Sequence, residues 1–169
     1  FNTYIFKIPI GKFSSILILY GLSLITRSSI IALLLAPPLF AGIFTTGVYL
    51  LVFYIRGRQA AYFASLMSSC SFIFLRLYLD LISNFIAWAL FPYALFLILR
   101  ISTNNDSFTY DLLFFSLLIL FMAFSHIWSF LIFSLILIFY IILLLTFNGL
   151  YKTIKFIAKI LLSMAPLII

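Results

Sequence analysis

The sequence predicts an all-α fold, a polytopic transmembrane helix bundle of about six to seven spans. Of its 169 residues, 67% are hydrophobic, 20% are aromatic and 8% are charged; the mean hydropathy is +1.36. A soluble domain cannot bury so much apolar surface, whereas charge-free runs of roughly 15–28 residues suit a bilayer. The composition therefore excludes a disordered chain, a coiled coil and a water-soluble enzyme.

Residues 1–169 read as a single transmembrane domain that we expect to be a fragment of a longer chain. The sequence starts at Phe1 and stops at Ile169 inside an apolar run. It does not open like a signal peptide, which needs a basic start and a small-residue cleavage site. The lone Cys70 cannot form an internal disulfide, so cysteine usage does not reveal the compartment.

The first two predicted spans meet near a proline pair. Pro37-Pro38 fits the first turn of a helix, where the missing N–H is not needed. We therefore expect a break at about Arg27–Ala36, and a turn at Arg56-Gly57-Arg58. The predicted spans are 13–35, 37–55, 60–75, 81–99, 112–125 and 127–148, with a seventh cut short after the basic loop 151–155; a polar loop is expected at 100–111.

The positive charges predict the orientation of these spans. Lys and Arg are retained in cytoplasmic loops, and if each stretch crosses once, eight of the ten fall on one side. The other side keeps Arg27 and Arg76, together with Asp80, His126 and Trp128. A glycan on the acceptor pattern at Asn105 would overturn this orientation. The cytoplasmic group is Lys7, Lys12, Arg56, Arg58, Arg100, Lys152, Lys155 and Lys159. Because these charges are scattered singly, they form no nucleic-acid-binding patch.

One polar group on the outer side is a candidate ligand site. Arg76, Asp80 and Asn84 are spaced four residues apart, so on a helix they share one face, with Ser83 beside them. They either line an outer cavity where Arg76 holds a phosphate through its planar fork, or cap the outer ends of the third and fourth helices.

His126 and Trp128 lie between two apolar stretches on the same predicted side. They either rim the same cavity or anchor the helices at the membrane interface. No second His, no Glu and no Cys pair completes a metal ligand set in this sequence, so no metal site is predicted, and the cofactors and catalytic residues stay unknown.

Two rows of small residues mark the third stretch, Ala60/Ala64/Ser68 and Ala61/Ser65/Ser69. Such rows let helix backbones approach closely in lipid. We expect this stretch to be buried among other helices.

The order of features from Pro37 to Leu145 resembles the membrane region of GT-C type glycosyltransferases, archaeal members in particular. The cues are Leu-Ala-Pro37-Pro38-Leu-Phe opening a helix, Arg56-Gly57-Arg58-Gln59-Ala60-Ala61, the segment from Leu75 to Asn84, and Ala123-Phe124-Ser125-His126 before a long apolar helix. The resemblance implies an extracytoplasmic site that uses a polyprenyl-phosphate sugar donor, with an acidic residue in the first outer loop and often a divalent metal. No outer acidic motif precedes Arg27 here, so whether the chain is itself an enzyme is left open.

The rival hypothesis is a non-catalytic hydrophobic subunit of a respiratory or other multi-subunit membrane complex. The Phe- and Ile-rich composition without Glu suits an organelle-encoded subunit. A small transporter would need two similar halves, and no internal repeat is evident. The expected partners are the lipid bilayer, a polyprenyl-phosphate lipid, and other membrane subunits or the rest of the chain. The expected location is the cell membrane or, alternatively, the mitochondrial inner membrane.

Overall fold

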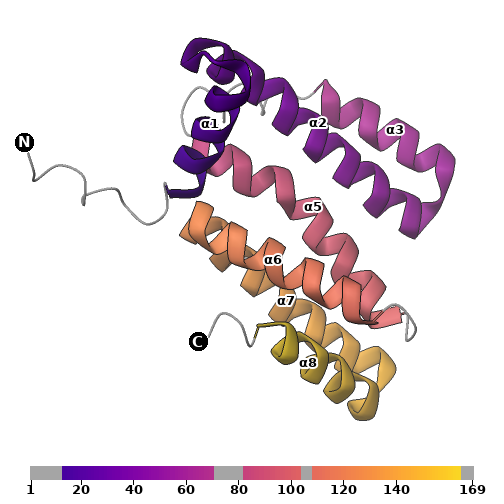
Figure 1. Ribbon diagram of the computed structural model, residues 1–169. Helices are drawn as coiled ribbons and strands as arrows, with labels where there is room; N and C mark the ends of the chain where they lie inside the picture. Colours follow the sequence, from indigo (N-terminus) through magenta and orange to yellow (C-terminus); the bar gives the residue numbers. More distant parts are fainter. Residues whose placement is uncertain (1–12, 71–81, 104–107, 165–169) are drawn as a thin grey trace, which may run out of the picture.

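A computed structural model describes residues 13–70, 82–103 and 108–164, and all of these segments are built from helices, without a strand. The helices are drawn in Figure 1. They are α1 (Phe13–Thr26), α2 (Ser29–Arg56), α3 (Arg58–Ser69), α5 (Ile82–Thr103), α6 (Phe108–Ser125), α7 (Ile127–Asn148) and α8 (Leu150–Met164).

Three of the described helices, α2, α5 and α7, are long and apolar enough to cross a membrane. At about 1.5 Å per residue, the 28 residues of α2 reach about 42 Å, more than the ~30 Å of a hydrocarbon core. The 12 residues of α3 reach only about 18 Å. The all-α membrane-type fold is thus confirmed, with three candidate spans in the described segments.

The three candidate spans run in the same direction, and α3 and α6 run back between them (Figure 1). α2 and α5 lie side by side, with Phe40 edge-to-face on Phe85 near one end and Tyr54 edge-to-face on Phe96 near the other. α6 returns to a one-residue turn at His126, and α7 then runs back along α5.

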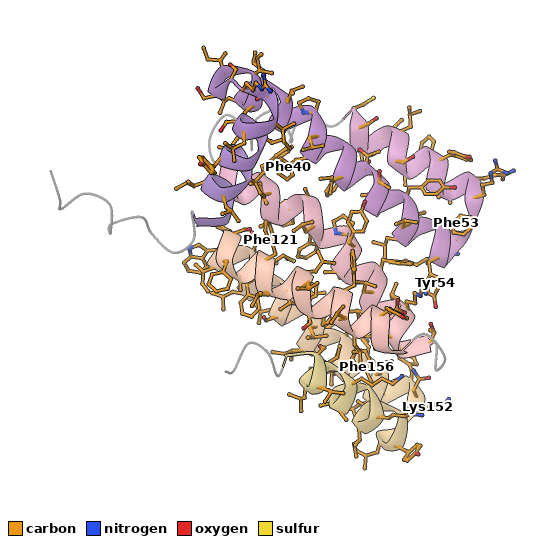
Figure 2. The ribbon with its side chains drawn as sticks, in the orientation of Figure 1. Phe40, Phe53, Tyr54, Phe121, Lys152 and Phe156 are labelled. Atoms are coloured by element: carbon orange, nitrogen blue, oxygen red, sulfur yellow. The ribbon has the colours of Figure 1, made fainter. Side chains whose placement is uncertain are left out.

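Two hydrophobic cores hold the bundle together. The larger one joins α5, α6, α7 and α8, with Phe115, Phe133, Ile119 and Met122 fully buried at its centre. The smaller one joins α2 and the start of α5, and residues of α1 together with Phe121 of α6 pack against it. Figure 2 shows Phe40 and Phe121 toward one end of the bundle, and Tyr54 and Lys152 toward the other.

The predicted helix boundaries are confirmed at the α6–α7 junction; the break predicted at Arg27–Ala36 is confirmed at Arg27–Ser28 and wrong from Ser29 to the proline pair. α6 ends at Ser125 and α7 begins at Ile127, as predicted. Pro37 and Pro38 lie inside α2, which already begins at Ser29, after the Ser28 hydroxyl that accepts from the Ile31 N–H. Ala36 and Phe40, on either side of the pair, are buried against α5. This packing carries the helix past two missing N–H donors.

Two predicted loops are also replaced by helix. Residues 151–155, predicted as a basic loop, belong to α8, because Gly149 at φ +77° makes the turn in a single residue. Glycine adopts this left-handed backbone without a steric cost. The polar loop predicted at 100–111 shrinks from both sides, since α5 continues to Thr103 and α6 begins at Phe108.

The small-residue rows of α3 pack as predicted on one side only. Ala61 is fully buried, and the helix lies back along the second half of α2. Tyr62 and Phe63 on the other side are 53% and 64% exposed. Burial of α3 on all sides is therefore wrong for the described residues, and the third predicted stretch, 60–75, extends into residues that lie outside them.

Candidate functional site

The two ends of the bundle differ sharply in charge. The α2–α3 turn, the end of α5 and the α7–α8 turn meet at one end, which we call the basic end. It carries Arg56, Arg58, Arg100, Lys152 and Lys155, and the Lys159 ammonium reaches the end of α5 there. The opposite end carries Arg27 between α1 and α2 and His126 between α6 and α7. The structure therefore separates the charges as the sequence predicted, except for Lys7, Lys12 and Arg76, which lie outside the described residues.

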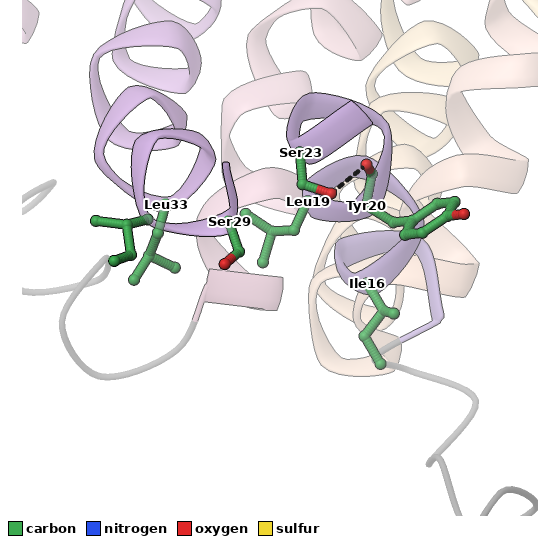
Figure 3. A pocket seen from close by; sticks show the side chains of 7 residues that line it. Ile16, Leu19, Tyr20, Ser23, Ser29 and Leu33 are labelled. Atoms are coloured by element: carbon green, nitrogen blue, oxygen red, sulfur yellow. Dashed lines mark hydrogen bonds between the residues drawn. The ribbon is translucent and has the colours of Figure 1, made fainter. Parts of the chain in front are cut away.

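The candidate site is a groove between α1 and α2 at the Arg27 end, with a volume of about 450 Å³. Figure 3 shows side chains of both helices around it. Its walls are mostly apolar, and hydroxyl groups of Ser23 and Ser29 lie at the end nearest the turn. The lining residues are Ile16, Leu19, Tyr20, Ser23, Ser29, Ile30 and Leu33.

Local hydrogen bonds fix the turn that closes this groove. The Thr26 hydroxyl lies 2.8 Å from the Leu22 carbonyl oxygen and 2.9 Å from that of Ser28, and shares its proton between them. The Ser28 hydroxyl accepts from the Ile31 N–H at the start of α2. Serine is a favoured N-cap because its oxygen satisfies an N–H that the helix leaves unpaired. The sequence Thr-Arg-Ser-Ser thus ends one helix and begins the next.

Arg27 occupies the strained position of this turn. Its φ is +53°, and among the described residues it is the only non-glycine residue with positive φ. An L-residue pays about 1–2 kcal/mol for this left-handed backbone. The Arg27 side chain is exposed beside the first turn of α2, whose N-terminal N–H groups carry partial positive charge. An anionic group at this position would meet a guanidinium and a helix N-terminus together.

His126 has a structural partner at the same end. Its Nδ1 accepts from the Ser129 backbone N–H at 3.3 Å and lies 3.2 Å from the Ser129 hydroxyl. His126 is therefore the N-cap of α7, which requires a neutral ring with its proton on Nε2. Burial lowers the pKa of His126, which favours this neutral form.

The remaining predicted site residues divide into two groups. Trp128, two residues after the cap, is 66% exposed at the start of α7 and fits the interfacial interpretation. Arg76 and Asp80 lie outside the described residues, and Asn84 belongs to α5 with a side chain that is also outside them. Only Arg27, His126 and Trp128 can therefore be placed, all at one end.

The groove itself was missed by the sequence analysis. The signal was present in Thr26-Arg27-Ser28-Ser29, a helix stop followed by an N-cap, but the proline pair further along the chain extended the predicted break to Ala36. Within the described segments, no group of three or more His, Cys, Asp or Glu side chains comes together as a metal site.

The fold and the groove define a helical protein of the membrane type with an apolar-walled groove at the end that carries Arg27. Comparison of the chain with protein-family models, with curated proteins and with solved structures found no match.

Proposed function

We propose that the chain is a multi-pass membrane protein that holds a lipid phosphate in the α1–α2 groove, and that it is part of a GT-C type glycosyltransferase taking its sugar from a polyprenyl phosphate. The groove carries this proposal. Its apolar walls suit the isoprenoid chain. Ser29 lines the groove two residues after Arg27 in the sequence, so we place the phosphate between the Ser29 hydroxyl and the Arg27 guanidinium. Arginine donates two parallel hydrogen bonds to a phosphate.

The proposed topology puts the basic end in the cytoplasm and the groove end outside. The excess of positive charge at the basic end supports this orientation. In this topology α2, α5 and α7 all cross from the groove end to the basic end, and α6, about 27 Å long, is the described helix best suited to return. The total of six to seven spans stays a prediction beside the three candidate spans of the described residues. The membrane is the cell membrane, with the mitochondrial inner membrane as the alternative.

Arg76, Asp80 and Asn84 belong to the same proposed site. The sequence places them just before and at the start of α5, and α5 begins at the groove end of the bundle. Arg76 would supply a second cation for the lipid phosphate. No outer acidic motif precedes Arg27 in this sequence, so the role proposed for these residues is binding of the donor phosphate.

The test is photo-crosslinking of the purified protein with a diazirine-bearing polyprenyl phosphate. We expect labelled peptides from α1 and the first half of α2, and competition by unlabelled polyprenyl phosphate. Arg27→Gln should weaken binding by roughly 10- to 100-fold, since a charge-assisted hydrogen bond contributes about 1.5–3 kcal/mol. Arg56→Gln, a change at an exposed arginine of the basic end, is the matched control and should bind normally.

Two outcomes would count against the proposal. An equal loss of polyprenyl phosphate binding in Arg27→Gln and Arg56→Gln would show that the lipid is attracted by positive charge in general and not held at a specific site. Equal competition by phosphatidylglycerol would show that the groove accepts any anionic lipid, which would remove the support for a glycosyl donor.

The second candidate function is a non-catalytic subunit of a membrane complex, favoured by the outer face of α3. Tyr62, Phe63, Leu66 and Met67 are all at least 52% exposed on a helix of 12 residues. A helix too short to span a bilayer can cover such a face with a neighbouring subunit. Co-purification of the native protein with stoichiometric membrane partners, without polyprenyl phosphate binding, would favour this candidate.

A further inference from the structure

We propose that α8 is an interfacial helix whose Lys152 and Lys155 bind the headgroup of an anionic phospholipid at the basic end. This site lies at the other end of the bundle from the groove, and its occupant is a membrane phospholipid instead of a sugar donor. It stands independently of the proposed transferase function.

The position of α8 suits the membrane surface. Its 15 described residues, Leu150–Met164, reach about 22 Å. Gly149 turns the chain directly from the end of α7 into α8, so the first turns of α8 start at the basic end (Figure 1). Figure 2 shows Lys152 at this position and Phe156, one turn further on, among the other helices.

The surface of α8 has three distinct sectors. One sector packs against the bundle, with Thr153, Phe156, Ile160 and Ser163 buried. A second is an exposed apolar stripe of Leu150, Ile154 and Leu161, with exposed fractions of 68%, 54% and 60%. The third is the lysine row at positions 152, 155 and 159, which share a face by their spacing of three and four residues. Apolar and basic sectors on one exposed surface are the pattern of a helix that lies in a membrane interface.

The lysine row divides into an anchor and two exposed charges. Lys159 is 9% exposed, and its ammonium donates to the Ile101 carbonyl oxygen at 3.3 Å. Lys152 and Lys155 are exposed. They lie three residues apart, so their ammonium groups can reach one phosphate, and their aliphatic stems can extend along the neighbouring apolar surface.

The charge around the row favours an anion. Among the described residues, Asp111 is the one acidic side chain at the basic end, and it pairs with Arg100 at 3.0 Å. Burial, and then the positive charge of Lys155, lower the pKa of Lys159. A phosphate between Lys152 and Lys155 would relieve the repulsion along the row, and lipid acyl chains would cover Leu150, Ile154 and Leu161. Anionic lipids attract juxtamembrane Lys and Arg by about 1 kcal/mol for each charge.

The experiment measures phosphatidylglycerol binding to the full purified protein by native mass spectrometry, with phosphatidylcholine as the neutral reference. We expect the wild type to retain phosphatidylglycerol selectively. Lys152→Gln/Lys155→Gln should bind it roughly 30-fold more weakly, the loss that corresponds to two charges of about 1 kcal/mol each. Lys152→Arg/Lys155→Arg should retain binding, because the charge is kept.

Arg56→Gln is the matched control, since it removes an exposed charge at the same end without touching α8. If Arg56→Gln weakens phosphatidylglycerol binding as much as Lys152→Gln/Lys155→Gln does, the lipid is attracted by the charge of the whole basic end, and the α8 site is refuted. Retention of phosphatidylglycerol by the glutamine pair would refute it as well, and so would displacement of the lipid by inorganic phosphate at equal concentration. If Lys152→Gln/Lys155→Gln does not fold, the folded Lys152→Arg/Lys155→Arg variant decides: loss of phosphatidylglycerol binding in that variant would refute the proposal.

Discussion

The Lys159 ammonium donates a hydrogen bond to the Ile101 carbonyl oxygen across 58 residues of sequence. Ile101 lies in the last turn of α5, where carbonyl groups have no partner within the helix and carry partial negative charge. A cation at this position both satisfies an acceptor and opposes the helix dipole. α8 is thereby attached to the end of α5 as well as to its sequence neighbour α7.

Replacing Lys159 with methionine should destabilise the bundle by about 1–2 kcal/mol. Methionine keeps most of the side-chain volume but loses a charge-assisted hydrogen bond, which contributes about 1.5–3 kcal/mol; relief of the buried charge offsets part of that. Lys159→Arg keeps the charge and should therefore lose less stability than Lys159→Met. The measurement is thermal or denaturant unfolding in detergent, and a Lys159→Met variant at least as stable as wild type would show that desolvation of the ammonium outweighs the bond.

The Arg100–Asp111 ion pair should couple the end of α5 to the start of α6. The Asp111 side chain is 11% exposed and that of Arg100 36%, and each charge also opposes its own helix dipole. We expect Asp111→Asn to lower the free energy of unfolding by about 1–2 kcal/mol, less than in a fully buried pair because Arg100 can still reach water. A double-mutant cycle with Arg100→Gln should give a coupling energy of about 1 kcal/mol. Strictly additive effects would contradict this coupling.

Gly47 should be essential for the contact between α2 and α5. A Cβ at this position would lie 2.7 Å from the Tyr93 ring and 3.1 Å from the Cβ of Pro92. Gly47→Ala should therefore destabilise the protein by about 1–3 kcal/mol, the usual cost of overpacking. A Cβ added at Gly42, in the same helix, would meet no atom within 4 Å, so Gly42→Ala should be neutral or stabilising by up to about 1 kcal/mol. The same sign for both variants in unfolding experiments would refute the predicted contact.

Acid should weaken the α6–α7 junction. Burial lowers the pKa of His126 from its usual 6.5, so the unfolded chain binds a proton more readily than the folded one. The stability from this group is full above pH 6.5 and is lost as the pH falls through the lower folded value. Protonation of Nδ1 also removes the acceptor for the Ser129 N–H.

Hydrogen exchange of the first turn of α7 between pH 7.5 and 5 measures this effect, after correction for intrinsic exchange rates. We expect protection at Ser129 to fall in the wild type. His126→Asn supplies a cap without a titrating ring and should keep its protection across the range. A loss of equal size in this variant would assign the pH effect to another group.

The sequence predicted best where local chemistry decides the structure. Ser125-His126-Ile127 ends and restarts a helix through a cap formed within four residues, so the boundary could be placed to the residue. The proline pair misled because its effect depends on tertiary packing: Ala36 and Phe40 hold α2 against α5 across the missing N–H groups. Gly149 was passed over because an apolar-to-basic change after it resembled a loop, while the glycine itself makes the whole turn.

The candidate site also combines features set by the local sequence with features set by tertiary packing. Alternation of the predicted spans put Arg27, His126 and Trp128 on one side, and the structure places them at one end of the bundle; which side of the membrane that end faces stays a prediction. The groove could not be predicted, because it forms between α1 and α2 only through the left-handed backbone of Arg27. Lys159 was grouped with the loop cations because its partner, Ile101, lies too far away in sequence for any pattern to reveal it.

The single-residue turn at His126 has a consequence for how the protein is made. α6 and α7 are joined without a loop, so there is no polar segment that could be translocated by itself while the second helix waits in the ribosomal tunnel. In the proposed topology, in which α6 returns across the membrane, the two helices would partition into the membrane together as a closed hairpin, with their backbone polar groups already paired. Biogenesis of this half of the chain would then proceed by pairwise insertion, and a ribosome stalled before the end of α7 should leave α6 unintegrated.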